Sequence, residues 1–237
     1  ITSHRLLEKK KLIEIGIEVA PFYEVKTRGD LHKAAQHMGF PCVLKTAIGG
    51  YDGKGQWKLE SFDDLNCIPH TIFKTHSPTI LEKWIPIEKE ISVVIAKGIN
   101  QDVVIYPLTV NLHRNHILHI SYTPPTMEES VVNRIHEIAS KIASSLEFVG
   151  VLTIEIFLTE DRQLLVNELA PRPHNSGHYT LEATSCSQFT QFIRAVTGQP
   201  LQSPRLFSSA IMVNILGEHV EALWQCFSQL PQGMNLH

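Results

Sequence analysis

The chain contains little cysteine and no long hydrophobic run. Its four cysteines stand far apart, at positions 42, 67, 186 and 226, and form no C-x-x-C pair, which excludes zinc-ribbon and thioredoxin-type chemistry. We expect them to be small buried hydrophobic residues instead. No apolar stretch approaches the ~20 residues that span a bilayer, and no signal-peptide pattern is visible. We therefore expect a cytoplasmic protein with no membrane partner.

An excess of charge of one sign is also missing. The 237 residues carry a net charge of −3, so no electrostatic attraction to nucleic acid is expected. The patterns G-x-G-x-x-G and G-x-x-x-x-G-K-[ST] do not occur, which excludes the Rossmann and P-loop modes of nucleotide binding. Apolar residues at 43% and charged residues at 19% are typical of a globular protein with one large or two smaller domains. Because the chain begins with isoleucine, we expect it to be a piece of a longer protein.

Histidine is plentiful, with 13 residues. Closely spaced histidines can bind a metal ion, so their spacing decides whether a metal site is expected. His113, His116 and His119 are three residues apart, which would suit one face of a helix. The surrounding sequence indicates a strand, a turn and a strand, where the three side chains would scatter. His174 and His178 form H-x-x-x-H, but a proline and a glycine interrupt any helix there. We expect no catalytic zinc.

Two glutamates are the most informative feature that is present. The segments 149–158 and 164–169 are rich in Val, Ile, Leu and Phe and flank a polar turn, which predicts a β-hairpin. If the turn is centred on the Asp-Arg pair at 161–162, residues whose numbers sum to 323 face each other. Glu155 and Glu168 would then lie on one face, roughly 5 Å apart.

Two carboxylates this close repel each other unless a cation lies between them. Mg²⁺ prefers oxygen ligands and commonly combines one or two carboxylates with phosphate oxygens and water. The alternative is a pair of glutamates on a solvated sheet face. Asp-Arg is not a preferred two-residue turn, and a slip of one residue would place the pair on opposite faces.

The remaining pattern predicts α+β lobes built from antiparallel sheets with helices outside. Helix 3–15 has Ser3 as its N-cap and Gly16 as its stop. Helix 127–146 has an apolar stripe that we interpret as core. Further helices are expected at 30–38, 61–66 and 187–197, the last with Phe189, Phe192, Ile193 and Val196 on one face. Strands are expected at 42–46, 57–59, 79–84, 91–97, 103–110 and 117–122.

A strand lysine and a glycine-rich loop indicate a phosphate site. Lys45 ends the apolar strand P-C-V-L-K-T and could act as a point charge on a phosphate. The loop 49–55 holds four glycines in seven residues, so its N–H groups could wrap phosphate oxygens and close over a nucleotide. A plain flexible hairpin loop is the alternative.

The segment L-E-K-W-I-P-I-E-K-E, residues 81–90, indicates a hinge between two lobes, which is a usual place for a nucleotide base. Backbone groups of Glu82 to Ile85 could contact the adenine edge. Glu90 could accept hydrogen bonds from the ribose hydroxyls, although a surface charge is the alternative interpretation.

Taken together, these motifs resemble those of the ATP-grasp superfamily. Within it they are similar to the N5-carboxyaminoimidazole ribonucleotide synthases, the ATP-dependent carboxylases of purine synthesis. The resemblance covers nearly the whole chain, and the glycine loop and the string N-E-x-A-P-R-x-H-N-S-G-H are its most specific parts. The matching segments are S3-H-R-L-L-E-K, V43-L-K-T, G50-Y-D-G-K-G-Q-W, L81-E-K-W, K89-E-I-S-V-V, V149-G-V-L-T-I-E and V166-N-E-L-A-P-R-P-H-N-S-G-H-Y-T.

The resemblance implies an ATP-grasp fold whose N-terminal Rossmann-like lobe is absent from this chain. Residues 1–25 would form a linker helix and the entry, 26–83 the small lobe, and 84–237 the large lobe with the metal site. The basic C-terminal segment of the family would be missing, so the chain could bind ATP without a complete ribonucleotide site. A homodimer is implied for the full-length protein.

The resemblance also assigns residues at the matched positions. Mg²⁺, or Mn²⁺ in its place, would be bound by Glu155 and Glu168. Adjacent strand residues point to opposite faces, so Asn167 beside them must act through its backbone, or the strand must bulge. ATP would be contacted by Arg5, Lys45, Gly50, Tyr51, Asp52, Gly53, Lys54, Gly55, Gln56, Glu82, Lys83, Trp84, Ile85, Glu90, His113, Asn167 and Glu168. The bicarbonate and aminoimidazole pocket would be lined by Tyr51, Asp52, Arg172, His174 and Asn175, with Lys45 acting on the phosphates.

The implied reaction starts with phosphorylation of bicarbonate by ATP to carboxyphosphate. Aminoimidazole ribonucleotide then takes up the carboxyl group on its exocyclic amine, and ADP and phosphate leave. Two alternatives stay open. One is a different ATP-grasp carboxylate-amine ligase, against which the P-R-x-H-N-S-G-H string argues. The other is a non-catalytic nucleotide-binding module, which the intact glutamate pair and lysine oppose.

Overall fold

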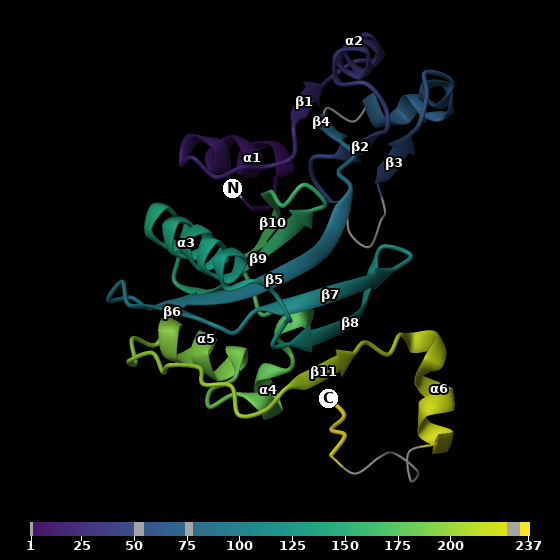
Figure 1. The fold of residues 1–237 in the computed structure, drawn as a ribbon. Helices are drawn as coiled ribbons and strands as arrows, with labels where there is room; N and C mark the ends of the chain where they lie inside the picture. The colour runs from purple at the N-terminus through teal and green to yellow at the C-terminus, as the bar shows by residue number, and fades with distance from the viewer. Residues whose placement is uncertain (1, 50–54, 74–77, 227–232) are drawn as a thin grey trace.

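A computed structural model describes residues 2–49, 55–73, 78–226 and 233–237, and within these ranges the chain forms two β-sheets with helices around them (Figure 1). The smaller sheet and the larger sheet are joined by the long strand β5 (Ile87–Lys97), which follows the last strand of the smaller sheet. The α+β class and the antiparallel sheets predicted from the sequence are confirmed. Every helix in the described part is too short or too polar to cross a lipid bilayer.

The smaller sheet has the order β1-β4-β2-β3, and all its neighbouring strands are antiparallel. Its strands are β1 (Phe22–Val25), β2 (Cys42–Thr46), β3 (Gln56–Leu59) and β4 (Thr79–Lys83). Helix α2 (Arg28–Met38) packs on β1 and β4. It begins with a capping box, in which Thr27 and Asp30 each accept the other's backbone N–H. Two 3₁₀ turns follow β3, at η1 (Asp63–Cys67) and η2 (His70–Phe73).

The larger sheet has the order β10-β9-β5-β7-β8-β11, and β6 pairs with the far end of β5. Its further strands are β6 (Val103–Ile105), β7 (Thr109–Arg114), β8 (Ile117–Thr123), β9 (Gly150–Thr159), β10 (Leu164–Ala170) and β11 (Ala210–Val213). The sequence predicted one strand over 103–110. The structure has two, because Pro107 lacks the N–H that a continuous ladder would need.

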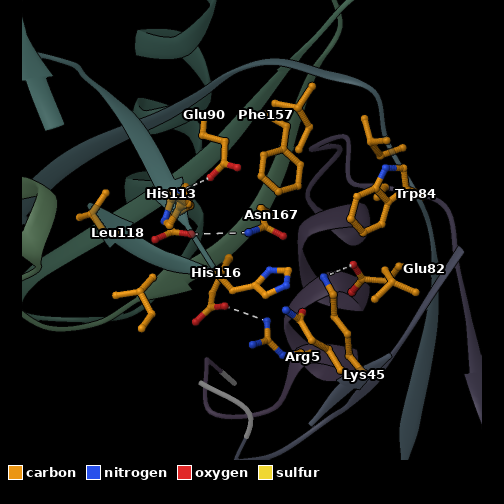
Figure 2. A pocket seen from close by; sticks show the side chains of 18 of the residues that line it. Arg5, Lys45, Glu82, Trp84, Glu90, His113, His116, Leu118, Phe157 and Asn167 are labelled. Carbon is orange, nitrogen blue, oxygen red and sulfur yellow. Dashed lines mark hydrogen bonds and ion pairs between the residues drawn. The ribbon is translucent and has the colours of Figure 1, made fainter. Parts of the chain in front are cut away.

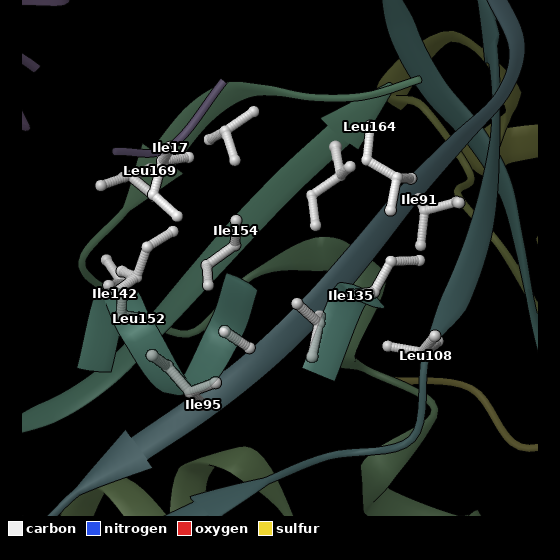
Figure 3. Packing of buried hydrophobic residues seen from close by; sticks show 14 of the residues in the cluster. Ile17, Ile91, Ile95, Leu108, Ile135, Ile142, Leu152, Ile154, Leu164 and Leu169 are labelled. Atoms are coloured by element: carbon white, nitrogen blue, oxygen red, sulfur yellow. The ribbon is translucent and has the colours of Figure 1, made fainter. Parts of the chain in front are cut away.

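The main hydrophobic core lies between this sheet and helix α3 (Glu129–Ser145) (Figure 3). Ile135 and Ile142 from the predicted apolar stripe are fully buried against Ile91 and Ile154 of the strands. Side chains alternate along a strand, so the neighbours of these isoleucines, such as Glu155, point to the opposite face. Burial of one face by α3 therefore determines which residues are left for the other.

Helix α1 (Arg5–Glu14) connects the two sheets, since it contacts β4 of the smaller sheet and β10 of the larger one. Its N-cap lies one residue later than predicted: it is His4, whose Nδ1 accepts the Leu7 N–H at 3.5 Å, and not Ser3. The predicted stop at Gly16 is confirmed by its φ of +70°, a backbone conformation that favours glycine.

The face opposite α3 carries η3 (Asn175–Gly177), α4 (Thr180–Ala183) and α5 (Gln188–Val196), and β11 leads into α6 (Gly217–Cys226) (Figure 1). The apolar face predicted for 187–197 is largely turned outward, with Phe189 39% and Ile193 54% exposed. The buried residues of α5 are Gln188, Gln191 and Ala195.

The glutamate hairpin forms, and Glu155 of β9 lies opposite Glu168 of β10, as predicted. The predicted route to this pairing is wrong. The turn is a three-residue loop closed by Arg162 at a φ of +67°, so residues near it pair with numbers that sum to 322, as Leu164 with Leu158 does. A bulge between Val166 and Glu168 then adds one residue. The two shifts together restore the sum of 323.

The cysteine prediction is correct for Cys42 and Cys186, which are buried, and wrong for Cys67, which is exposed at the end of η1. The side chain of Cys226 lies outside the described residues. Cys67 is exposed because a short 3₁₀ turn on the surface buries only one side, and in η1 that side carries Leu65.

Candidate functional site

A cleft of about 490 Å³ lies between the two sheets and is lined by residues from both of them and from α1 (Figure 2). Figure 2 shows Trp84 and the Lys45–Glu82 pair on one side of the cleft and His113 with Glu90 on the other. Its lining residues are Arg5, Ala20, Val43, Lys45, Gln56, Glu82, Lys83, Trp84, Ile85, Ile87, Glu90, His113, His116, Ile117, Leu118, Glu155, Phe157, Asn167, Glu168, Arg172, His174, Asn175, Asn214 and Leu216.

One wall of the cleft holds a buried carboxylate between two lysines. Lys45 of β2 donates to Glu82 of β4 at 2.8 Å, and the ammonium of Lys9 lies 3.5 Å from the other oxygen of Glu82. Burial alone would raise the pKa of Glu82, but the charges of Lys45 and Lys9 outweigh it and lower that pKa to about 2. Burial lowers the pKa of Lys9, although the charge of Glu82 opposes this, and Lys45 is the lysine of this pair that lines the cleft.

Arg5 lies where α1 meets the hairpin. Its Nη1 donates to Oε2 of Glu168 at 2.7 Å, so the start of α1 is fixed to the bulged strand. Glu8, one turn further, accepts the backbone N–H of Leu169 at 3.2 Å. Burial, followed by the charge of Glu168, raises the pKa of Glu8 to about 8. Helix α1 therefore holds both the side chain and the backbone of β10 at this point.

The bulge on β10 decides which side chains reach the cleft. Two residues, Asn167 and Glu168, oppose the single residue Glu155, and all three line the cleft. The Nδ2 of Asn167 donates to Oε2 of Glu155 at 3.5 Å. Of the two possibilities left open for Asn167, the strand bulge is therefore the correct one. A flat strand would have turned either Asn167 or Glu168 into the core.

The two carboxylates and the amide form an oxygen-rich group. Burial, followed by the charge of Glu168, raises the pKa of Glu155 to about 7. The buried Oδ1 of Asn167 finds no hydrogen-bond partner among the described residues. These oxygen donors, with Glu168 also paired to Arg5, fit a hard divalent cation such as Mg²⁺.

The protein oxygens would not complete the coordination of such an ion. In the described ranges, no three His, Cys, Asp or Glu side chains gather as a metal cage. An ion at Glu155 and Glu168 would take its remaining ligands from water or from a phosphate in the cleft, which is the usual arrangement for Mg²⁺.

On the opposite wall, Glu90 of β5 and His113 of β7 form a short pair, with 2.6 Å between Oε2 and Nδ1. Desolvation lowers the pKa of His113, but the hydrogen bond and the charge of Glu90 outweigh it and raise that pKa. One oxygen of Glu90 is thus occupied by His113, and within the described residues the other accepts no hydrogen bond.

The segment that follows β4 has part of its backbone already hydrogen-bonded. The N–H of Lys83 donates to the Pro21 carbonyl and the N–H of Trp84 donates to the Pro41 carbonyl. The N–H groups of Lys83 and Trp84 are therefore not available to a base. The groups of the predicted adenine-contacting segment that can still contact a base are mainly its carbonyls and the N–H of Ile85. The Trp84 ring, 37% exposed, lies beside them and carries Lys58 over its face at 4.5 Å.

The loop after β10 brings three polar side chains to the floor of the cleft. Arg172 is exposed, and His174 and Asn175 are half-buried. Burial, followed by the charge of Arg172, lowers the pKa of His174 to about 4, so its ring is neutral at pH 7. Nδ1 accepts the N–H of Ser176 at 3.4 Å, which leaves the ring proton on Nε2, 3.3 Å from Glu155.

Most of the site residues predicted from the sequence meet in this cleft. Of those in the described part of the chain, Gly55 alone does not line it. Gly50, Tyr51, Asp52, Gly53 and Lys54 lie outside the described residues.

Several lining residues were missed. Val43 and Phe157 lie two residues from Lys45 and Glu155 on the same strands, and strand alternation could have identified them. His116 lies in the turn between β7 and β8. Asn214 and Leu216 follow β11 and reach the cleft only because β11 pairs with β8. The local sequence carries no signal for that long-range pairing.

Comparison with known proteins identifies the arrangement. The family model of the ATP-grasp domain matches residues 10–189. An N5-carboxyaminoimidazole ribonucleotide synthase of Bacillus subtilis (strain 168) is 44% identical over 221 residues, which cover 93% of this chain and 58% of that protein. A crystal structure of the ADP complex of an N5-carboxyaminoimidazole ribonucleotide synthetase superposes with a TM-score of 0.92 at 41% identity, covering 97% of this chain and 60% of that one.

A second similar structure contains two ligands. It is an N5-carboxyaminoimidazole synthase from Aspergillus clavatus in complex with ADP and 5-aminoimidazole ribonucleotide, with a TM-score of 0.85, 27% identity, and coverage of 96% of this chain and 61% of that one. The chain thus spans about three fifths of the length of the relatives it matches.

Proposed function

Because the chain belongs to the ATP-grasp family, we propose that its cleft is the ATP-dependent centre of an N5-carboxyaminoimidazole ribonucleotide synthase. The reaction is the carboxylation of 5-aminoimidazole ribonucleotide with bicarbonate and ATP in purine biosynthesis. The identity of 44% to a synthase of that name supports the proposal. The chain would contribute the nucleotide site, and the rest of the longer protein would complete the ribonucleotide site.

The observation that carries the proposal is the bulged hairpin facing the lysine wall. Glu155 and Glu168 lie opposite each other on one face, and Lys45 and Arg5 line the same cleft. Phosphoryl transfer needs little covalent chemistry from a protein, because its transition state mainly spreads negative charge over oxygens. A cleft that brings fixed cations and a pair of carboxylates together suits that need.

In this proposal Lys45 and Arg5 neutralise the phosphates, and Glu82 holds Lys45 in place. Mg²⁺, or Mn²⁺ instead, would be held by Glu155 and Glu168 and would neutralise phosphate charge when bound. The adenine would lie against Trp84 and the backbone near Ile85, and the free oxygen of Glu90 would accept from the ribose. The loop over residues 50–56 would cover the phosphates.

The acceptor side is formed by Arg172, His174 and Asn175. Arg172 is exposed at the floor of the cleft and can bind an oxyanion with two parallel N–H groups. In the first step bicarbonate oxygen attacks the γ-phosphorus of ATP, giving carboxyphosphate and ADP. In the second, the amine of aminoimidazole ribonucleotide takes the carboxyl group and releases phosphate and a proton. Neutral His174 is placed to orient a substrate without repelling Arg172.

The test uses the full-length protein and follows phosphate release and carboxylated product. We expect Glu168→Gln to lose about 10²-fold or more in turnover, since it removes one of the paired carboxylates. Glu160→Gln, in the exposed loop of the same hairpin, is the matched control and is expected to keep wild-type turnover. Full turnover in Glu168→Gln, or phosphate release that does not depend on aminoimidazole ribonucleotide, would contradict the proposal.

A further inference from the structure

Helix α5 buries a polar face. Gln188 and Gln191 are both fully buried, whereas Phe189 and Ile193 on the same helix are exposed. Burying a carboxamide is costly unless its groups are hydrogen-bonded. The contacts of these two glutamines therefore explain why the helix lies with its polar face inward.

The carboxamide of Gln188 holds the backbone of one residue in the cleft loop. Its Oε1 accepts the N–H of His174 at 2.9 Å, and its Nε2 donates to the carbonyl of His174 at 2.7 Å. These paired bonds imitate a rung of a β-ladder, because both backbone groups of His174 are satisfied at once. They also determine which end of the amide is oxygen, since an N–H needs an acceptor and a carbonyl needs a donor.

The loop is shaped to accept this side chain. A Cβ on Gly177 would come within 2.5 Å of Oε1 of Gln188, so a larger residue there would push the amide away from the His174 backbone. Thr180 closes the arrangement: its Oγ1 accepts the N–H of Gln188 at 2.9 Å and donates to the Gly177 carbonyl at 2.6 Å. The loop and the start of α5 thus form one hydrogen-bonded unit.

We propose that Gln188 is a positioning residue that sets the loop over residues 171–178 so that Arg172, His174 and Asn175 face the glutamate pair. In the described part of the chain Gln188 does not line the cleft, and it acts only through the backbone of His174. Beyond that backbone lies the His174 ring, with its Nε2 3.3 Å from Glu155. The inference rests on the proposed function, which places bicarbonate and the aminoimidazole at this loop.

Gln191 supplies a matched control. It is equally buried on the same helix, and it makes the same pair of bonds to the backbone of Gln202, with Nε2 donating at 2.6 Å and Oε1 accepting at 3.1 Å. Gln202 does not line the cleft within the described ranges. Replacing either glutamine removes a similar number of buried hydrogen bonds, but only one replacement releases the cleft loop.

The experiment compares Gln188→Leu with Gln191→Leu in the full-length protein, by steady-state kinetics and thermal unfolding. We expect Gln188→Leu to lower kcat by about 10- to 100-fold, because a misplacement of about 1 Å costs on the order of 10²-fold. KM for ATP should change by less than about threefold, since the loop lies on the acceptor side. Gln191→Leu should lower Tm by a similar amount and keep kcat within about threefold.

A second variant adds a pH signature. In Gln188→Glu a protonated carboxyl has the same donor and acceptor as the amide, whereas an ionised one loses the donor to the His174 carbonyl. Burial raises the pKa of a carboxyl, so we expect near wild-type kcat at pH about 6 and a loss of about tenfold by pH about 9. Gln191→Glu should show no such change in kcat relative to wild type.

Hydrogen–deuterium exchange separates the two proposals. We expect peptides covering 171–178 to exchange faster in Gln188→Leu than in wild type or Gln191→Leu, whether or not the protein turns over. Wild-type protein that carboxylates nothing would contradict the proposed function only. Equal kinetics and equal loop exchange in the Gln188 and Gln191 variants would overturn the role of Gln188 and leave the proposed function standing.

Discussion

At the scale of single residues, three glutamates at or near the cleft have very different acidities. Glu82 lies between two lysines and has its pKa lowered to about 2, whereas burial and the charge of Glu168 raise the pKa of Glu8 to about 8 and of Glu155 to about 7. The residue type is the same in each case, and only the neighbouring charges and the burial differ. Glu8 and Glu155 are therefore partly protonated near neutral pH, whereas Glu82 is ionised.

This leads to a pH dependence of stability that centres on Glu8. Its folded pKa of about 8 lies above the ordinary value of 4.5, so the folded protein holds a proton that the unfolded chain releases. The stability gained from this proton is complete below pH about 4.5 and is lost as the pH rises to about 8. Over that window it amounts to at most about 5 kcal/mol.

We therefore expect Glu8→Gln to flatten the decline in unfolding free energy between pH about 5 and about 8. The amide keeps an oxygen for the Leu169 N–H and removes the titration. The measurement is urea unfolding across this pH range with a chelator present. Glu14→Gln, at an exposed position of the same helix, is the control, and an unchanged pH slope in Glu8→Gln would contradict the assignment.

At the scale of elements, two helices with similar apolar patterns differ in burial: one buries its apolar face and the other exposes it. Ile135 of α3 is completely buried in the core, and Ile193 of α5 is 54% exposed. Both belong to apolar faces that the sequence predicts. Apolar spacing identifies the side of a helix that prefers to leave water, but not which side the neighbouring elements leave open to it.

We expect substitutions of these two isoleucines to lower the unfolding free energy of the 237-residue chain by unequal amounts. Ile135→Ala should reduce the unfolding free energy by about 2–5 kcal/mol, because it leaves a cavity under the sheet. Ile193→Ala should change it by less than about 0.5 kcal/mol, as surface substitutions usually do. Chemical denaturation measures both values. A loss at Ile193 as large as at Ile135 would mean that the outward face of α5 is covered.

At the scale of the whole molecule, the cleft exists because α1 and β5 join two separate sheets. Lys45 comes from the smaller sheet, Glu155 from the larger one and Arg5 from α1 between them. A ligand that contacts all three stabilises the arrangement of the lobes and not only one side chain. A bound nucleotide is therefore expected to raise the unfolding free energy of both sheets and α1 together.

We expect Mg·ATP at about 100 times its Kd to stabilise the chain by about 2.7 kcal/mol, the value for a ligand that binds only the folded state. Thermal unfolding with increasing Mg·ATP measures the effect. Lys45→Met should lose most of it, since the phosphates would face one cation fewer. Equal stabilisation by adenosine, which has no phosphates, would show that the lysine wall is not where the phosphates bind.

Local pattern in the sequence determined most of the elements and many of the site residues. The limits of β2, the stop of α1 at Gly16 and the core stripe of α3 follow from spacing and from turn chemistry, which act over a few residues. The resemblance of its motifs was enough to name the ATP-grasp fold.

The tertiary structure alone decided the remaining features. The loop of three residues and the bulge at Asn167 compensate each other only when β9 and β10 pair over their full length. The contact of Gln188 with His174 and the approach of Asn214 to the cleft join segments that are distant in sequence or held by other elements. Such contacts depend on how whole elements pack, and the packing free energy is shared among many residues, so a local pattern does not reveal it.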